Sequence, residues 1–377
     1  MKIKPEELYK LLYKYGVEFY TGVPDSTIKD FCFFLDSNLP KSKHIIAANE
    51  GNSIGIATGY HLSTGKIPLV YMQNSGFGNA INPITSLADK SVFSIPMLIM
   101  LGWRGEPETN DAIQHQKDGQ IQISLIESLG IPYTILSNNS NNLEDQIDNS
   151  VKLAEEQSSP FFLLVRRNSF EKSRHKLAYP KIESDMSREY AISEIIKSIE
   201  NDAAIISTTG KISRELYESR LKQGDDNHKD FRVIGSMGHA SSISLGMSIS
   251  NEKRKVYCID GDGSIIMHMG ALSVIGKYGS SNFRHILLNN FSHDSVGGQA
   301  SSSDVIDFSI LSRSLSYKSY YKIAKKSDFN DIFTEFISSP GPSFLEIVVT
   351  QGSRSDLSRP NISPIDNKKS FMEFFGD

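Results

Sequence analysis

The sequence contains little cysteine, no long apolar run and no strong excess of one charge. Its two cysteines, Cys32 and Cys258, lie in apolar segments, so no disulfide framework is indicated and a reducing cytoplasm is the expected compartment. The formal net charge is −4, which gives no reason to expect a nucleic-acid or membrane partner. No segment approaches the roughly 18 apolar residues of a membrane span, and the charged N-terminal residues lack the apolar region of a signal peptide.

Two common phosphate-binding motifs are also missing. The sequence has neither the glycine-rich loop with a lysine that cradles nucleoside triphosphates nor the G-x-G-x-x-G turn of dinucleotide-binding domains. This argues against a nucleoside triphosphate and against a nicotinamide cofactor. A local cluster of residues can still bind a small anion, because the net charge of a chain does not describe a single site.

The chain has 377 residues, enough for two or three domains that each bury a core of their own. Strand and helix patterns alternate over residues 5–165 and again from residue 188, which predicts α/β domains with mostly parallel sheets. Residues 166–187, between the two series, are polar and charged and contain a proline, as is typical of a linker. We predict a duplicated plan, with a first domain over residues 1–167, a linker over 168–187 and a second domain over 188–377.

Two predicted strands of the second half end in polar residues that suit a metal ion. The apolar residues 256–259 lead into Gly261-Asp262-Gly263, a helix is expected over residues 267–278, and a strand over 285–288 ends at Asn289-Asn290. Parallel strands end at the same edge of a sheet, where ligands of open α/β sheets bind. A carboxylate and an amide oxygen suit Mg2+ that keeps a phosphate ligand. The alternative is a tight turn followed by an asparagine-rich loop; the spacing of one βαβ unit favours the metal site.

Other turns of the second half are rich in glycine and small polar residues. Glycine lets the backbone approach an anion, and helix N-termini donate N–H groups to it. Each turn alone is weak support, because such turns also use glycine for steric reasons. Together they predict a pocket for a diphosphate carried on Mg2+, formed by residues 208–211, 235–239, 261–264 and 289–295.

In the first half, Glu50 follows a predicted strand over residues 44–47 and precedes a helix of small residues expected over 53–62. An acid in the first turn of a helix is favoured by the helix dipole, which is the simplest interpretation. A carboxylate at such a strand end can instead exchange a proton with a bound heterocycle. Glu50 alone does not decide between these alternatives.

Seven segments together resemble one family closely, the phosphonopyruvate decarboxylases. The related sulfopyruvate decarboxylases share part of this pattern, and the G-D-G, helix, strand, N-N arrangement is similar to the signature of thiamine-diphosphate-dependent enzymes. The resemblance covers residues 18 to about 372. The segments are TGVPDS, ANEGNSIGIATGY, YMQNSGFGNAINP, GWRGEPETNDAIQHQ, TTGKISREL, GSMGHASS and LNNFSHDSVGGQ.

The resemblance implies thiamine diphosphate and Mg2+ as cofactors. It also implies two three-layer α/β domains with mostly parallel sheets, the first binding the pyrimidine and the second the diphosphate, without a middle domain. The implied metal ligands are Asp262, Asn290 and Ser292, where Ser292 would use its backbone carbonyl. Phe291 departs from the family pattern, in which small residues are more usual. The implied cofactor-binding residues are Glu50, Thr209, Gly210, Gly235, Met237, Gly261, Gly263, Ser264 and Ser295.

The resemblance also implies residues for catalysis and substrate binding. Glu50, contributed by a partner subunit, would share a proton with the pyrimidine ring, and Met237 would support the bent cofactor. Asp25 and His115 are the candidates for later proton steps; the alternatives are a turn residue and a surface loop histidine. A phosphonate suits a bidentate guanidinium. The substrate candidates are Arg104, Arg354 and His293. For each arginine the alternative is a solvated or ion-paired residue, and for Arg359, a third arginine considered, this alternative is favoured.

The expected function is the non-oxidative decarboxylation of 3-phosphonopyruvate to phosphonoacetaldehyde and CO2, in phosphonate biosynthesis. A sulfopyruvate decarboxylase, or a decarboxylase of another anionic 2-oxo acid, is the alternative within the class. Two alternatives of other classes are an inactive binding subunit and a Mg2+-dependent phosphatase. A homodimer or homotetramer with the active site between subunits is expected, in the cytoplasm, with a small anionic substrate and without nucleic-acid or membrane partners.

Overall fold

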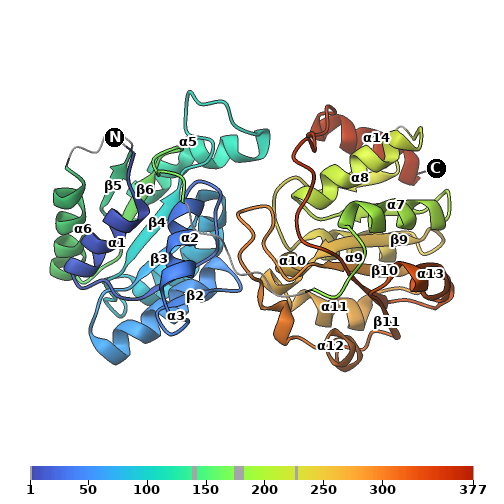
Figure 1. Ribbon diagram of the computed structural model, residues 1–377, viewed down its shortest axis with the longest axis horizontal. Helices are drawn as coiled ribbons and strands as arrows, with labels where there is room; N and C mark the ends of the chain where they lie inside the picture. The colour runs from blue at the N-terminus through green and yellow to red at the C-terminus, as the bar shows by residue number, and fades with distance from the viewer. Residues whose placement is uncertain (1, 138–141, 174–181, 226–227, 377) are drawn as a thin grey trace. The chain divides into compact units, whose positions relative to one another are not determined.

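A computed structural model describes residues 2–137, 142–173, 182–225 and 228–376. The chain divides into two compact units, Met1–Ala178 and Tyr179–Asp377, hereafter unit 1 and unit 2 (Figure 1). Residues 174–181 of the expected linker lie outside the described residues. On either side of these residues, Phe170 is buried in a core of unit 1 and Met186 in a core of unit 2. The domain boundaries drawn from the sequence remain a prediction.

Unit 1 is built on a six-stranded sheet in which every pair of neighbouring strands is parallel. The strand order is β2-β1-β3-β4-β6-β5. The central strands consist of consecutive apolar residues, as expected for parallel strands that are covered on both faces. The strands are β1 (Tyr20–Gly22), β2 (His44–Ile46), β3 (Leu69–Gln73), β4 (Leu98–Gly102), β5 (Tyr133–Leu136) and β6 (Phe161–Val165).

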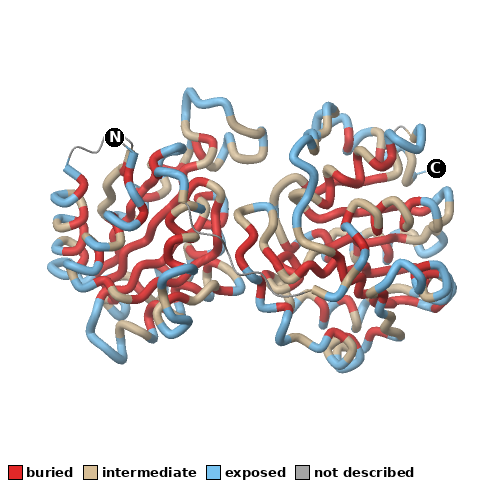
Figure 2. Tube along the Cα trace, in the orientation of Figure 1, coloured by how far each residue is buried: buried red, intermediate tan, exposed pale blue. Residues whose placement is uncertain are grey.

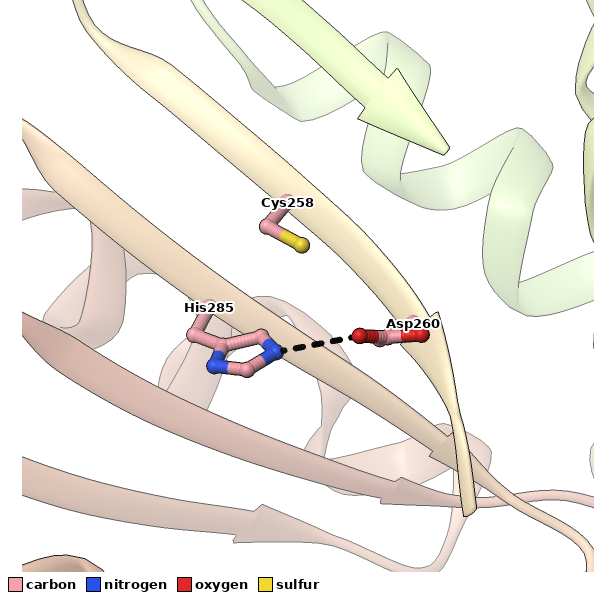
Figure 3. Close-up of side chains that lie close together, drawn as sticks. All are labelled: Cys258, Asp260 and His285. Atoms are coloured by element: carbon pink, nitrogen blue, oxygen red, sulfur yellow. Dashed lines mark ion pairs between the residues drawn. The ribbon is translucent and has the colours of Figure 1, made fainter. Parts of the chain in front are cut away.

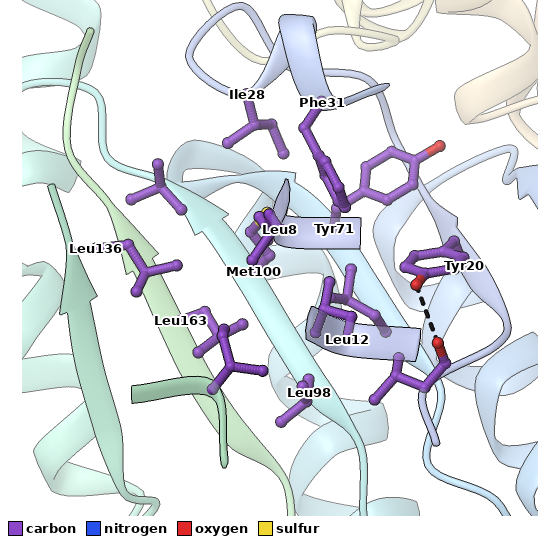
Figure 4. Packing of buried hydrophobic residues seen from close by; sticks show 14 of the residues in the cluster. Leu8, Leu12, Tyr20, Ile28, Phe31, Tyr71, Leu98, Met100, Leu136 and Leu163 are labelled. Carbon is purple, nitrogen blue, oxygen red and sulfur yellow. Dashed lines mark hydrogen bonds between the residues drawn. The ribbon is translucent and has the colours of Figure 1, made fainter. Parts of the chain in front are cut away.

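Helices cover both faces of this sheet and enclose two apolar cores. One core joins the sheet to α1, α2 and α6; Figure 4 shows Leu8 and Leu12 of α1 packed with Leu98 and Met100 of β4. The other core joins the opposite face to α3, α4 and α5. The helices are α1 (Pro5–Lys14), α2 (Lys29–Asn38), α3 (Glu50–Thr64), α4 (Phe77–Pro83), α5 (Ile113–Ser128) and α6 (Leu143–Gln157).

Unit 2 contains a second parallel six-stranded sheet, in the order β11-β12-β10-β9-β7-β8. When its strands are renumbered from the start of the unit and read from the opposite edge, this order is the same as in unit 1. The duplicated plan expected from the sequence is therefore present in the strand topology. The strands are β7 (Ala204–Ser207), β8 (Asp230–Arg232), β9 (Val256–Gly261), β10 (Phe283–Asn289), β11 (Ser319–Ile323) and β12 (Ser343–Val348).

The helices of unit 2 follow the same pattern. One core lies between the sheet and α7, α8 and α13, and the other between the sheet and α9, α11 and α12. Figure 2 shows the buried strands of each unit within helices whose outer faces are exposed. The helices are α7 (Arg188–Ser198), α8 (Lys211–Lys222), α9 (Ala240–Ser250), α10 (Asp262–Met267), α11 (Ala271–Tyr278), α12 (Phe308–Ser314), α13 (Phe329–Ser338) and α14 (Pro364–Gly376).

These findings confirm the predicted fold class, two three-layer α/β units with parallel sheets. Three helix boundaries were predicted wrongly. The helix expected over residues 53–62 begins earlier, at Glu50, and the helix expected over 267–278 is divided into α10 and α11. The residue types of 102–119 predict a polar loop, but the loop ends at Ala112 and α5 begins at Ile113. No described helix is long and apolar enough to cross a membrane.

Candidate active site

Glu50 is a buried acid at the start of α3, the helix that follows β2. The Asn49 side chain fixes the start of this helix by accepting a hydrogen bond from the Asn52 backbone N–H at 2.9 Å. The Asn79 amide donates to Glu50 Oε2 at 2.8 Å. Burial raises the pKa of Glu50, and the hydrogen bond from Asn79 opposes this shift. Glu50 therefore holds a proton more readily than an exposed glutamate does.

The position of the Glu50 side chain depends on Gly76. A Cβ at Gly76 would lie 2.0 Å from Glu50 Oε1, so a larger residue would displace the carboxyl group. Gly76 ends a short 3-10 helix, Asn74–Gly76, that follows β3. At the other end of this helix, the Asn74 amide makes two hydrogen bonds with the backbone of Arg104, at 2.9 and 3.0 Å. The segment thus connects Glu50 to the loop that carries Arg104.

Asp25 is fully buried in the turn after β1. Its Oδ1 accepts hydrogen bonds from the backbone N–H groups of Thr27 at 2.8 Å and Ile28 at 3.2 Å. A Cβ at Gly102 would lie 2.0 Å from Asp25 Oδ1, so β4 ends in a glycine where this carboxyl group packs. Burial raises the pKa of Asp25 to about 6, although the backbone of Thr27 opposes the shift. Asp25 is therefore a carboxyl group that titrates near neutral pH.

Arg104 follows β4, and its guanidinium group is already bound within unit 1. Its Nε and Nη2 atoms donate to the two carboxylate oxygens of Asp111, each at 2.6 Å. Its Nη1 atom donates to Ser26 Oγ at 2.8 Å, beside the turn that carries Asp25. A bidentate pair of this kind is among the stronger polar contacts in proteins. The substrate contact predicted for Arg104 remains a prediction, and a substrate anion would compete with Asp111.

His115 lies in the first turn of α5, not in the loop in which the sequence placed it. A Cβ at Gly105 would lie 1.9 Å from the His115 carbonyl oxygen, and Gly105 has a positive φ of 67°. This close approach packs the start of α5 on the Arg104 loop. The structure therefore brings Asp25, Arg104 and His115 into one region of unit 1. The proton-transfer role of His115 remains a prediction.

In unit 2, Asp262 is the first residue of α10, directly after β9, and only 3% exposed. The hydroxyl groups of Ser301 and Ser303 both donate to Asp262 Oδ2, the latter at 3.2 Å. Ser303 Oγ also lies 3.0 Å from Asn289 Oδ1, so its single proton is shared between the two oxygens, and the contact links the ends of β9 and β10. Burial raises the pKa of Asp262 to about 6, and the hydrogen bonds from Ser301 and Gly263 oppose this shift.

Asn290 and Ser292 lie in the loop that follows β10, and β10 pairs with β9. The Ser292 backbone N–H donates to Asn290 Oδ1 at 3.2 Å, and Asn290 Nδ2 donates to Asp294 Oδ2 at 2.8 Å. Between them, Phe291 has a φ of 56°, in the left-handed region that L side chains rarely adopt. Glycine adopts this backbone conformation without steric cost, whereas the phenylalanine side chain is strained there.

The predicted diphosphate loops lie close to one another in two places. A Cβ at Gly210, which has a φ of 99°, would lie 2.7 Å from Ser295 Oγ, so the turns after β7 and β10 meet there. A Cβ at Gly263 would lie 2.8 Å from His293 Nδ1 and 3.3 Å from Met237 Cε. Glycine at these positions permits the approach of the loops. Four of the cofactor-binding residues predicted from the sequence therefore take part in these two contacts, together with His293. The four are Gly210, Ser295, Gly263 and Met237.

Ser264 connects two further loops of the predicted site. Its hydroxyl group lies 2.9 Å from Thr208 Oγ1, next to Thr209, and accepts a hydrogen bond from the Gly238 backbone N–H at 3.0 Å. Gly238 follows Met237 in the loop that begins at Gly235. The last strand residue of β9, Gly261, packs towards α8, because a Cβ there would lie 3.3 Å from Ile212 Cδ1.

Arg354 does not join this group. Its guanidinium group is paired with the carboxylates of Glu189 on α7 and Glu218 on α8, and with Asp356, at the surface of unit 2. These ion pairs correspond to the structural alternative that the sequence left open for this arginine. The substrate contact predicted for Arg354 remains untested.

A buried polar group that sequence reasoning missed lies just before these loops. Donor atoms of Cys258, Asp260 and His285 lie within 4.8 Å of one another (Figure 3). His285 Nε2 is 3.7 Å from Asp260 Oδ2, and its Nδ1 is 3.0 Å from the Tyr317 hydroxyl. Cys258 and His285 face each other across the paired strands β9 and β10. The group lies on the two strands whose ends carry Asp262 and Asn290.

The donor set at these strand ends fits Mg2+. Asp262 offers a carboxylate, Asn290 an amide oxygen and Ser292 a backbone carbonyl, and hard cations prefer oxygen ligands. Burial deprives the Asp262 carboxylate of solvent, so a cation bound beside it would stabilise its charge. The close contacts at Gly210 and Gly263 bring together the loops that would surround the diphosphate. The residues present therefore suit a diphosphate carried on Mg2+.

Several partners of the predicted residues were not recognised in the sequence. Asn79 and Asp111 lie inside segments that carried the family resemblance, but nothing in the sequence indicated which side chains they contact. Ser301 and Ser303 belong to a run of serines, which by itself indicates only a polar loop. The Asn79, Ser301 and Ser303 contacts join residues that are distant in sequence, whereas Asp111 pairs with Arg104 within one loop.

Comparison with known proteins places this arrangement in one class. Residues 6–125 match the N-terminal TPP binding domain of thiamine pyrophosphate enzymes, and residues 209–347 match their C-terminal TPP binding domain. The chain belongs to the thiamine pyrophosphate enzyme family. Thiamine pyrophosphate is thiamine diphosphate, so the expected cofactor is confirmed for the family.

The relatives of the chain within this family carry more specific names. It is 27% identical to the phosphonopyruvate decarboxylase of Streptomyces viridochromogenes over 95% of this chain and 91% of that protein. It is 28% identical to the sulfopyruvate decarboxylase of Methanosarcina acetivorans over 98% and 97% of the two chains. It is also 31% identical to the beta subunit of the Methanococcus maripaludis sulfopyruvate decarboxylase over 48% and 95%. The resemblance to phosphonopyruvate decarboxylase is confirmed.

Proposed function

We propose that the chain is a thiamine-diphosphate-dependent carboxy-lyase that converts 3-phosphonopyruvate to phosphonoacetaldehyde and CO2 without oxidation. The observation that carries this proposal is the buried Glu50 carboxyl group in a chain whose other unit offers Asp262 and Asn290 as oxygen ligands. The similarity to phosphonopyruvate decarboxylase over nearly the whole length of both chains supports the choice of substrate. The pathway we propose is phosphonate biosynthesis, in the cytoplasm.

The residues of unit 2 would hold the cofactor. Asp262, Asn290 and the Ser292 carbonyl would bind Mg2+, which neutralises the diphosphate. The N-terminus of α8 directly follows Gly210, so its free N–H groups suit a phosphate oxygen. Thr209, Gly263, Ser264 and Ser295 would line the same region. When bound, thiamine diphosphate supplies an electron sink for the electron pair released as CO2 leaves a 2-oxo acid.

The residues of unit 1 would move protons. Burial favours the protonated form of Glu50, while Asn79 holds one carboxyl oxygen in place, so the group can exchange a proton with a ring nitrogen. Asp25, with a pKa of about 6, is suited to give and take a proton near neutral pH. His115 would assist from the first turn of α5.

Arg104, Arg354 and His293 remain the candidates for the substrate anion.

We further propose that residues 1–167 form the pyrimidine-binding domain and residues 188–377 the diphosphate-binding domain. Because Glu50 and the metal ligands would serve one cofactor, we infer a homodimer or homotetramer in which Glu50 of one subunit serves the cofactor bound to its partner. Light scattering with size-exclusion chromatography tests this assembly. A chain that is monomeric and active would contradict it.

A sulfopyruvate decarboxylase is the second candidate, supported by the full-length similarity to the enzyme of Methanosarcina acetivorans. Phosphonate and sulfonate differ mainly in charge, so both would use similar contacts. The two candidates predict opposite orders of kcat/KM for the two substrates.

The deciding experiment is a product assay on phosphonopyruvate, sulfopyruvate and pyruvate, with thiamine diphosphate and Mg2+ added or withheld. We expect phosphonopyruvate to be decarboxylated faster than sulfopyruvate or pyruvate, and to yield phosphonoacetaldehyde and CO2 only when thiamine diphosphate and Mg2+ are present. Faster turnover of sulfopyruvate would favour the second candidate. Mg2+-dependent release of inorganic phosphate from an added phosphate monoester, without thiamine diphosphate, would instead indicate a phosphatase.

A further inference from the structure

Asp294 lies in the loop after β10 and collects several hydrogen bonds on one carboxylate oxygen. Its Oδ2 accepts hydrogen bonds from Asn290 Nδ2 at 2.8 Å, from Arg188 Nη1 at 3.0 Å and from the Gly352 backbone N–H at 3.0 Å. Its Oδ1 lies 3.5 Å from the hydroxyl group of Ser292. Asp294 therefore contacts the side chains of two residues assigned to the metal site.

The contact with Asn290 fixes which end of that amide faces away from Asp294. A carboxylate only accepts hydrogen bonds, whereas an asparagine amide has a donating nitrogen end and an accepting oxygen end. The nitrogen end of Asn290 must therefore face Asp294, and its Oδ1 faces the other way, where it accepts from the Ser292 backbone N–H at 3.2 Å. Only the oxygen end of an amide can bind a hard cation.

Asp294 is itself held by a buried arginine. Arg188, at the start of α7, is 5% exposed and donates to both carboxylate oxygens of Glu215, at 2.7 and 2.9 Å. The same guanidinium group donates to Asp294. The loop after β10 is thereby attached to α7 and, through Glu215, to α8.

We propose that Asp294 is a positioning residue for the metal: it sets the orientation of the Asn290 amide so that Oδ1 is available to Mg2+. This inference rests on the proposed function, which makes Asn290 a metal ligand. Residues that orient metal ligands in this way typically change metal affinity about 10- to 100-fold when they are lost.

The test is the Mg2+ affinity of the full-length protein saturated with thiamine diphosphate, measured by titration calorimetry. Asp294→Ala removes the acceptor, and we expect it to weaken Mg2+ binding by about 10- to 100-fold. Asp294→Asn retains one acceptor oxygen, which can take the place of Oδ2, so its affinity should stay within about fivefold of wild type. Should Asp294→Ala not fold, Asp294→Leu, which also lacks a polar side-chain atom, replaces it.

Glu215→Ala is the matched control. It removes the other carboxylate of Arg188 without touching Asn290, so we expect reduced thermal stability and an unchanged Mg2+ affinity. If Glu215→Ala weakens Mg2+ binding as much as Asp294→Ala does, the role of Asp294 is only structural and the inference is wrong. An affinity of Asp294→Ala within twofold of wild type, or equal losses in the Ala and Asn variants, would also overturn it.

A second arm uses an Asn290→Asp background. The two oxygens of a carboxylate are equivalent, so orientation no longer matters, and adding Asp294→Ala should not weaken Mg2+ binding further. A further loss of tenfold or more would contradict the inference. These outcomes are separate from the proposed function: a wild-type chain that binds no Mg2+ with thiamine diphosphate contradicts the function, whereas normal binding in all variants contradicts only the role of Asp294.

Discussion

The segments that follow corresponding strands differ between the two units. In unit 1, the chain after β2 passes Asn49 and enters α3 at Glu50, so a buried acid stands at the helix start. In unit 2, the chain after the equivalent strand β8 passes Met237 and enters α9 with no acid in its first turn. The same backbone plan therefore offers a proton-carrying group in one unit and an apolar side chain in the other.

The third strands show the reverse difference. In unit 1, β3 leads to Asn74, whose amide is used to hold the backbone of Arg104. In unit 2, the equivalent strand β9 leads to Asp262, which is held by the hydroxyl groups of Ser301 and Ser303. Strand order alone cannot produce this division. A duplicated fold fixes where functional groups stand, while single residues decide which groups stand there. In the proposed function, this difference separates proton transfer by unit 1 from cation binding by unit 2.

The largest effect should come from Glu50→Gln, which breaks the proton-carrying part of unit 1. Glutamine keeps an oxygen that can accept from Asn79 but cannot give up or take a proton, so kcat should fall by about 10²- to 10⁴-fold. Because the ligands of unit 2 are untouched, the affinity for thiamine diphosphate with Mg2+ should change by less than about threefold. Steady-state kinetics and calorimetry measure the two values. Unchanged turnover would refute the role given to Glu50.

An intermediate effect is expected from Asp262→Asn, which breaks the cation site of unit 2. The variant keeps the shape of the side chain but loses its charge, so the half-saturating Mg2+ concentration should rise by at least about 100-fold. This exceeds the loss of metal affinity, about 10- to 100-fold, that is typical when a residue only orients a ligand. If units 1 and 2 divide the work as proposed, kcat at saturating Mg2+ should recover to within about tenfold of wild type. A low kcat that excess Mg2+ cannot restore would show that Asp262 also takes part in proton transfer.

The smallest effect, on stability, should come from Asp25→Asn. The folded-state pKa of Asp25, about 6, lies above the ordinary value for aspartate, so the unfolded chain loses this proton first and stability falls as pH rises towards 6. Above that pH the buried charge costs about 1–3 kcal/mol, which asparagine would remove. We expect Asp25→Asn to unfold at higher urea concentration than wild type at pH 8, with the difference vanishing near pH 4. A variant less stable at pH 8 would contradict this account.

The fold class followed from the sequence because strand and helix patterns alternate regularly and the central strands are continuously apolar. Boundaries were less well predicted where side-chain contacts decide them. The Asn49 cap starts α3 at Glu50, three residues before the expected position. The start of α5 was missed because its first turns contain Gln114, His115 and Gln116, which give no apolar period.

The sequence by itself determined which residue types follow the strands, and thereby the class of cofactor. Asp262 and Asn290 could be placed together because parallel neighbouring strands end at one edge, a consequence of local pattern and chain direction. Only the tertiary structure decided which groups hold them. Asn79 donates a hydrogen bond to Glu50, 29 residues away in sequence, and Ser301 donates one to Asp262, 39 residues away. Folding brings these segments together, and nothing in the sequence indicates that they would meet.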